Sequence, residues 1–259
     1  MTIKKSRDEA IEDLTLALMY LTSFSNSDVP RYDMFWKGYD FGTLEQLDKK
    51  ELIYDPVTKR GHSKYAFMTE KGRERARELL KEMGIKDKPL YEQFEFRNIK
   101  PEEADEAADI ESACFSPEEA CSRKHIKERI EAASDFFLVA IDKETGKMAG
   151  FLNGLATDEN RLRDEFFTDA SLHDPNGRNV ILAGLSVLPR YRHMGLAREL
   201  MFNYCRIQEE RGTRNMILTC VGGKVKMYEK MGFHDLGESA SMWGGHPWHE
   251  MSITLNYGF

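Results

Sequence analysis

The chain has 259 residues, of which 41% are hydrophobic and 31% charged, which suffices for one or two domains with buried cores. A formal net charge of −7 argues against a protein that binds nucleic acid over a broad surface. Its four cysteines include no Cys-x-x-Cys pair, so we expect reduced thiols and neither a disulfide framework nor a metal site. The sequence has no apolar signal core and no apolar run of about 18–20 residues, which predicts a soluble cytoplasmic protein without a membrane segment.

Residues 1–84 are predicted to form a small winged-helix-like domain. Ser6 and Glu9 have the spacing of a capping box, which begins a helix that runs to about Phe24. The apolar residues of this helix step by three and four and share one face: Ile11, Leu14, Leu18 and Leu21. The elements predicted next are a helix over 41–50, two short strands within 52–68 around a turn at 56–61, and a helix that Thr69 caps and Gly84 ends.

Residues 8–83 resemble a small bacterial domain of unknown function, a resemblance that implies no activity. It rests on the run from Trp36 to Phe41, on Leu47, on Asp55-Pro56 and on Thr69-Glu70-Lys71-Gly72. Residues 1–88 carry 17 basic and 16 acidic residues, and the run 44–50 is mixed in charge, which disfavours DNA binding. A partner-forming or dimer-forming domain and a lid over the rest of the chain are the alternatives that stay open.

Residues 85–93 are predicted to be a linker, which contains Lys86-Asp87-Lys88-Pro89, and residues 94–259 a second domain. Proline followed by two acids at 101–103 favours a helix start, because such residues suit the first turn. The predicted elements are a strand over 94–99, helices from Pro101 and from Ser116 or Ser122, a hairpin of strands 136–141 and 148–156, an irregular segment 157–178, a strand over 180–187, a helix over 195–211, a strand over 216–220, a short helix over 224–230, and two final strands joined by a two-residue turn at Gly244-Gly245.

The run from Val187 to Ala197 carries the strongest functional signal. A strand, a short basic turn with Gly195 and a helix place several backbone N–H groups and a helix N-terminus around one point. This geometry suits a phosphate-bearing ligand, although an ordinary solvated turn between a strand and a helix has the same local pattern. A second run, from Tyr228 to Gly232-Phe233, follows about thirty residues later.

These two runs, in this order and at this separation, resemble the GNAT superfamily of N-acetyltransferases over about residues 94–255. The matching patterns are Arg192-x-x-Gly195-x-Ala197 and Tyr228-x-x-x-Gly232-Phe233. Within the superfamily the sequence is most similar to arylalkylamine (serotonin) N-acetyltransferases and their bacterial relatives, through Ala113 to Pro117 among other segments. The resemblance implies an α/β fold with a mixed, mostly antiparallel central sheet flanked by helices, acetyl-CoA as the co-substrate, an amine acceptor and no metal.

The resemblance also assigns roles to particular residues. Tyr228 is implied as the general acid that protonates the coenzyme A thiolate after direct attack by the amine; a packed helix aromatic is the alternative. The strand that ends at Val187 and the strand over 216–220 are implied to splay apart around the thioester. The residues implied to bind coenzyme A are Leu185, Ser186, Val187, Arg192, His193, Met194, Gly195, Leu196, Ala197 and Lys224.

The general base is where the sequence departs from the serotonin acetyltransferases. Their two histidines on the strand before the loop align with Ile181 and Ala183, neither of which can accept a proton. Four residues are candidates by location only: Asp158, His246, His249 and Glu250. A metal at the last three is disfavoured, since His246 and His249 lie three apart and face opposite sides of a strand.

We expect the acceptor channel to be built by residues 114–123, 157–178 and 237–250, with Trp243 and Trp248 packed beside it or in the core. The alternative function is a regulatory protein that senses acyl-CoA and binds DNA or a protein partner through its first domain, as a homodimer or otherwise. The missing histidines motivate that alternative.

Overall fold

The computed structural model describes residues 5–23, 33–36, 38–55, 57–58, 61–62, 65–86 and 89–255. The chain divides into two compact units, Met1–Gln93 and Phe94–Gly258. Parts of the predicted turn at 56–61 and of the predicted linker, Pro56, Asp87 and Lys88 among them, lie outside the described residues. Within those ranges no helix is both long and apolar enough to cross a membrane.

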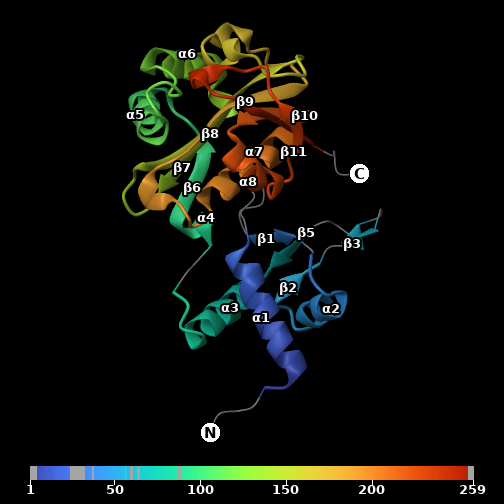
Figure 1. The fold of residues 1–259 in the computed structure, drawn as a ribbon. Coiled ribbons are helices and arrows are strands. Elements are labelled where there is room, and N and C mark those ends of the chain that lie inside the picture. Colours follow the sequence, from blue (N-terminus) through green and yellow to red (C-terminus); the bar gives the residue numbers. More distant parts are fainter. Residues whose placement is uncertain are drawn as a thin grey trace. The chain divides into compact units, whose positions relative to one another are not determined.

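The first unit combines helices with a three-stranded antiparallel sheet of order β1-β5-β2 (Figure 1). Its elements are α1 (Arg7–Leu21), β1 (Asp33–Trp36), α2 (Phe41–Lys49), β2 (Ile53–Tyr54), β3 (Val57–Thr58), β4 (Gly61–His62), β5 (Tyr65–Met68), α3 (Glu70–Glu82) and α4 (Leu90–Gln93). The predicted capping box of Ser6 and Glu9 is present, and Thr69 accepts a hydrogen bond from the Gly72 N–H at the start of α3. The comparison with a winged helix stays a prediction.

The buried face of α1 differs from the apolar face read in the sequence. Leu16, Met19 and Tyr20 are buried in the core of the unit, whereas Ile11, Leu14 and Leu18 keep 38–58% of their surface exposed. The core residues share the side of α1 that packs against α3 and the sheet. The helix therefore has two apolar stripes, and the predicted spacing of three and four follows the exposed one. Periodicity alone cannot show which of the two stripes is buried.

The second unit is built on one mixed sheet of order β11-β12-β10-β9-β8-β7-β6 (Figure 1). Its elements are β6 (Phe94–Asn98), α5 (Ala104–Cys114), α6 (Arg123–Ala133), β7 (Phe137–Asp142), β8 (Met148–Thr157), β9 (Asn179–Val187), α7 (Leu196–Arg211), β10 (Asn215–Cys220), α8 (Val225–Glu229), β11 (His234–Glu238) and β12 (His249–Thr254). Every neighbouring pair is antiparallel except β9 and β10. The predicted mixed, mostly antiparallel sheet with flanking helices is confirmed.

Helices cover both faces of this sheet. Asn153 of β8 accepts a hydrogen bond from Arg129 of α6, and the next residue, Gly154, faces the Tyr204 hydroxyl of α7. Because neighbouring residues of a strand point to opposite faces, α6 and its partner α5 cover one face while α7 covers the other. This double cover explains why all ten residues of β8 are buried.

The parallel strands β9 and β10 separate after a short pairing. Within residues 94–255, which the structure describes without a gap, they pair over Asn179–Ile181 and Asn215–Ile217. Beyond Ile181 the strand β9 stays bound to β8, and β10 stays bound to β12 as far as Cys220. A bulge that leaves Ala183 unpaired with β8 lies where the two strands part. The predicted splay is therefore present, and it opens a slot inside the sheet.

One prediction in this unit was wrong, and another was confirmed in only one of its two alternatives, the helix start at Ser122. Gly244 and Gly245 do not join the last strands by a two-residue turn; both have positive φ within a short helical turn, Trp243–Gly245, inside the connection 239–248. Ser116 begins only a turn, in which its carbonyl accepts from the Glu119 and Ala120 N–H groups, and the helix starts at Arg123 after the Ser122 cap. At Gly244-Gly245, the contacts of Trp243 and His246 with Glu119 override the local turn signal.

Candidate active site

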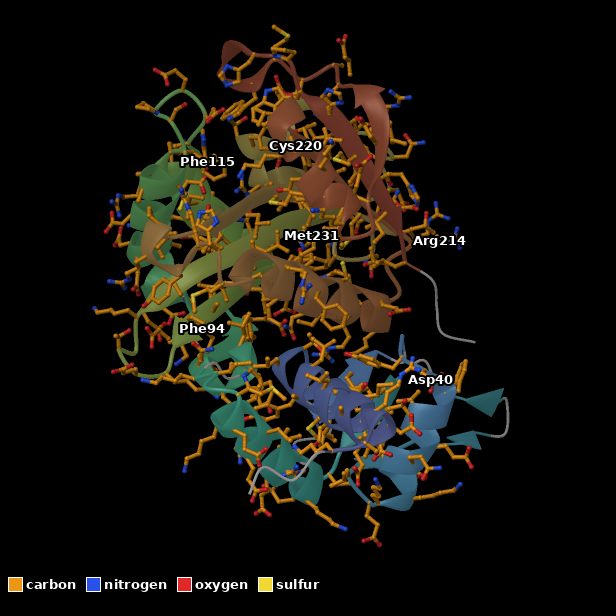
Figure 2. The ribbon with its side chains drawn as sticks, turned by 60° about the horizontal axis from the view of Figure 1, so that its bottom comes forward. Asp40, Phe94, Phe115, Arg214, Cys220 and Met231 are labelled. Carbon is orange, nitrogen blue, oxygen red and sulfur yellow. The ribbon has the colours of Figure 1, made fainter. Side chains whose placement is uncertain are left out.

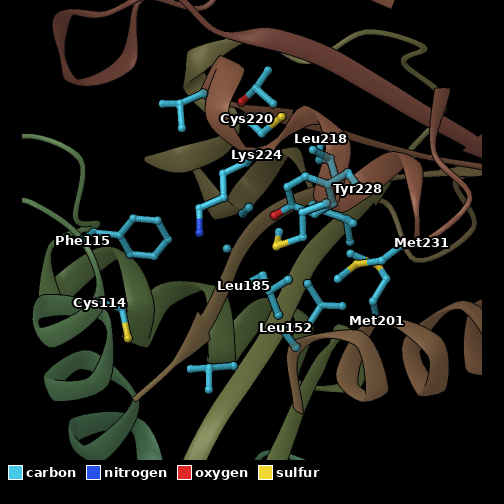
Figure 3. Close-up of a pocket in the computed structure, with 18 of the residues that line it drawn as sticks. Cys114, Phe115, Leu152, Leu185, Met201, Leu218, Cys220, Lys224, Tyr228 and Met231 are labelled. Atoms are coloured by element: carbon cyan, nitrogen blue, oxygen red, sulfur yellow. The ribbon is translucent and has the colours of Figure 1, made fainter. Parts of the chain in front are cut away.

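The slot between β9 and β10 opens into a pocket of about 530 Å³ within the second unit. One side, which we term the loop side, is formed by the end of β9, the following loop, the start of α7, the end of β10 and α8. The other side, the rim side, is formed by residues 111–121, Phe167 and the two tryptophans of the 239–248 connection. Figure 2 shows where Phe115 and Cys220 lie in the second unit, and Figure 3 shows both among the residues that line this pocket.

The loop side begins where β9 runs into the glycine turn. His193 has φ 64° and Gly195 has φ 90°, so the backbone turns sharply before α7 begins at Leu196. The first N–H groups of a helix have no acceptor within that helix and carry its positive dipole end, so this point attracts an anion. Most of the predicted coenzyme A residues line the pocket: Leu185, Val187, Arg192, His193, Gly195, Leu196, Ala197 and Lys224.

Three of the predicted residues differ from their implied role: Arg192 lines the pocket but is engaged by backbone, and Ser186 and Met194 do not line it. Arg192 donates from Nε to the Val187 carbonyl at 2.9 Å, and its backbone N–H donates to Pro189. Arg192 therefore braces the end of β9, and its guanidinium is less free to bind a phosphate than the sequence suggests. Ser186 is fully buried and Met194 is exposed, and neither lines the pocket.

Tyr228 projects from α8 into the pocket. Figure 3 shows its hydroxyl and the Lys224 ammonium group directed toward the same open space. The Tyr228 ring packs edge-on against Phe233, and its hydroxyl has no hydrogen-bond partner among the described residues. Burial, with a smaller contribution from Cys220, raises the pKa of Tyr228, so the phenol keeps its proton and can donate it.

The rim side is held together by hydrogen bonds between segments far apart in the sequence. Trp243 donates from Nε1 to the Glu119 carbonyl at 2.7 Å, and the Glu119 carboxylate contacts His246 Nε2 at 2.7 Å. The Phe167 ring lies 5.0 Å from the Trp243 ring, and Asp164 accepts from the Met242 N–H. The three segments expected to build an acceptor channel therefore meet here.

Glu119 is negatively charged on this rim. Partial burial alone would raise the pKa of its carboxyl, but hydrogen bonds from His246 and Ser116 outweigh that effect and lower it. The rim thus presents a carboxylate beside aromatic rings, a combination suited to a cationic group with an apolar body.

Sequence reasoning missed Glu111, a carboxylate in the pocket. It lies on α5 with only 2% of its surface exposed, and it accepts hydrogen bonds from the Cys121 N–H and the Ser186 hydroxyl. A signal was available: Glu111 follows Ala107 and Ala108 by four and three residues, on the buried face of its helix. An acid in such a position needs partners.

The residues named earlier as candidate bases are placed differently. Asp158 pairs with Arg178 on the surface, His249 pairs with Asp235, and neither lines the pocket. Glu250 is buried in β12 and does not line the pocket either. His246 contacts the rim residues Glu119 and Trp248 but does not itself line the pocket. Among residues 5–255, as far as they are described, no group of three or more metal-binding side chains gathers.

The fold and the pocket are those of an acetyltransferase domain. A family model described as "Acetyltransferase (GNAT) family" matches residues 104–233, half of the chain, and one described as "Domain of unknown function (DUF6429)" matches residues 7–86. The chain belongs to the GNAT acetyltransferase family.

Individual relatives point the same way. The chain is 31% identical over 113 residues to the serotonin N-acetyltransferase of Mesocricetus auratus, a match that covers 43% of this chain and 53% of that protein. It is 28% identical over 165 residues to the serotonin N-acetyltransferase of Macaca mulatta, covering 62% and 78%. The chain thus spans about half the length of the first relative. The loading GNATL domain of CurA from Lyngbya majuscula shares the fold, with a TM-score of 0.55, 13% identity, and 62% and 98% of the two chains covered.

Proposed function

We propose that the protein is an acetyl-CoA-dependent N-acetyltransferase, which transfers an acetyl group to a primary amine by direct attack. The observation that carries this proposal is the slot between β9 and β10, with the Tyr228 hydroxyl directed into it. Membership of the GNAT family supports acyl transfer as the class of reaction.

Each part of the loop side has a task in this reaction. The backbone edge at Leu185–Val187, which no strand occupies, hydrogen-bonds the amides of the pantetheine arm. The first N–H groups of α7 and the turn before it bind the pyrophosphate, because a helix N-terminus favours an anion. Lys224 adds a positive charge at the pocket wall.

Tyr228 completes the transfer. The amine lone pair forms a bond to the thioester carbon, the carbon–sulfur bond breaks, and coenzyme A leaves as a thiolate. The Tyr228 hydroxyl then gives its proton to the sulfur, a form of general acid catalysis typically worth about 10²–10⁴ in rate. The raised pKa keeps that proton in place until the thiolate forms.

Two measurements test the proposal. Saturating acetyl-CoA is expected to raise the melting temperature, since a ligand that binds the folded state at 100 times its Kd adds about 2.7 kcal/mol. Thiol release is then followed over polyamines, arylalkylamines, aminoglycosides and peptides with free N-termini. Turnover of at least one amine supports the proposal. Binding of acetyl-CoA without thiol release from any amine contradicts it and favours a regulatory acyl-CoA sensor.

A further inference from the structure

The proposed reaction, on which this inference rests, leaves one proton without an acceptor. A neutral amine that attacks the thioester must lose one proton from its nitrogen to become an amide, and Tyr228 can supply a proton but not remove that one. Ile181 is fully buried in the strand pairing, and Ala183 has no titratable group. Within the described part of the second unit, the acids that line the pocket are Glu111 and Glu119.

Glu111 lies on the opposite face of the sheet from Tyr228. It belongs to α5, which covers one face of the sheet together with α6, whereas Tyr228 belongs to α8, and both side chains line the pocket. Figure 3 agrees, with Cys114 of α5 and Tyr228 on opposite sides of β9. An acyl group held in the slot would therefore have Tyr228 on one side and Glu111 on the other.

Three groups fix the Glu111 carboxylate beneath β9. Its Oε1 accepts from the Cys121 N–H at 3.2 Å, and its Oε2 accepts from the Ser186 hydroxyl at 3.0 Å. A β-carbon added to Gly184 would lie 3.7 Å from Oε2, so the glycine leaves a gap in front of this oxygen. The carboxylate is therefore held rigidly but still borders the pocket.

The surrounding charges let this carboxylate exist in both protonation states. Arg129 of α6, itself buried, attracts it without a direct hydrogen bond and donates instead to Asn153 and to the Phe167 carbonyl. The thiols of Cys121 and Cys114 are the other titratable groups close to Glu111. Cys121 lies just before α6, and Cys114 lies one turn after Glu111 on α5, beside Arg192. Burial outweighs the hydrogen bonds and Arg129, and it raises the pKa of Glu111.

We propose that Glu111 is the general base of the reaction and accepts the proton of the attacking amine. The balance is complete for the neutral amine, which forms when the ammonium group releases its extra proton to solvent. The amine nitrogen gives one proton to Glu111 and Tyr228 gives one to the sulfur. Glu111 then releases its proton to solvent and Tyr228 regains one from solvent. An amide and a free coenzyme A thiol are the products. A base with a raised pKa is better matched to neutral pH than an ordinary glutamate, whose pKa is about 4.3.

The test is the pH profile of the full-length protein with an amine that it acetylates. Wild type is expected to gain activity as the pH rises through the pKa of Glu111. E111Q should lower kcat by about 10²–10⁴ and lose this acidic limb, while the acetyl-CoA-induced rise in melting temperature stays. E106Q is the matched control, because Glu106 also lies on α5 and accepts a backbone N–H, from Met148, outside the pocket.

A second variant keeps the inference testable if E111Q does not fold. S186A removes a donor that favours the charged carboxylate, so the acidic limb should move to higher pH. A purely structural role for Glu111 would lower stability without moving the limb. An E111Q enzyme with wild-type kcat and pH profile, or an unmoved limb in S186A, overturns the inference while leaving the proposed function intact. If the wild-type protein releases no thiol with any of the tested amines, both the inference and the proposed function are overturned.

Discussion

The loop side of the pocket is built around one continuous stretch of chain, residues 185–198, to which β10 and α8 add side chains, whereas the rim side consists of side chains from three distant segments. The first offers a strand edge, a glycine turn and the start of α7 within residues 185–198. The second joins Glu119, Phe167 and Trp243 through hydrogen bonds and ring contacts. The backbone features of the loop side suit a ligand part that is constant, and the side chains of the rim suit one that varies.

The largest expected effect comes from removing the proton donor on the loop side. Y228F should lower kcat by about 10²–10⁴ while acetyl-CoA binding, followed by the rise in melting temperature, stays at the wild-type level. Y204F is the control, because it removes a buried hydroxyl that donates to the Phe136 carbonyl outside the pocket. It should lower stability by about 1 kcal/mol and leave turnover unchanged. Wild-type turnover in Y228F would exclude the phenol from the mechanism.

A second change tests whether the glycine turn before α7 takes part in binding acetyl-CoA. In G195A a side chain enters a backbone with φ 90°, which costs about 1–2 kcal/mol and shifts the turn. We expect acetyl-CoA to bind about tenfold more weakly, measured by calorimetry. G146A places the same strain in an open surface turn at φ 67° with no atom near the added carbon. Equal binding losses in the two variants would contradict a role for the loop in binding.

The smallest effect is expected on the rim, from its histidine. H246Q breaks the pair between His246 and Glu119. Because both side chains are partly exposed to solvent, this pair contributes only about 0–1 kcal/mol. The KM for the amine should therefore rise by no more than about fivefold, with the KM for acetyl-CoA unchanged. H249Q breaks a similar pair with Asp235 away from the pocket and should change neither constant. If H246Q instead changed only the KM for acetyl-CoA, the division between the two sides would be wrong.

The contrast between the two sides also explains which features the sequence could predict. The loop side follows from a contiguous pattern, so the strand, the turn and the helix were predicted near their observed positions, and the family resemblance implied the splay. The strand β1 and the buried face of α1 were not, because a short strand and two competing apolar stripes have weak local signals.

The rim could be predicted only as a set of segments. Gly244-Gly245 has the local pattern of a hairpin turn, but Trp243 is held by Glu119 more than a hundred residues away. Glu111 has no motif at all; its partners, Cys121 and Ser186, come together only through the fold. The spacing of Glu111 from Ala107 and Ala108 indicates that it is buried, but its partners are set by tertiary packing and cannot be predicted from that spacing.

The separation of β9 and β10 also concerns aggregation. A free strand edge at the border of a sheet is a template on which other chains can pair, and proteins must protect it. Here the free edge over 182–187 lies inside the sheet and is closed at one end by the pairing of Ile181 with Ile217. A foreign strand cannot slide in along that edge, but a slender amide-bearing arm can enter from its open end. The slot between β9 and β10 thus lets a small molecule pair with this free edge but prevents a polypeptide strand from doing so.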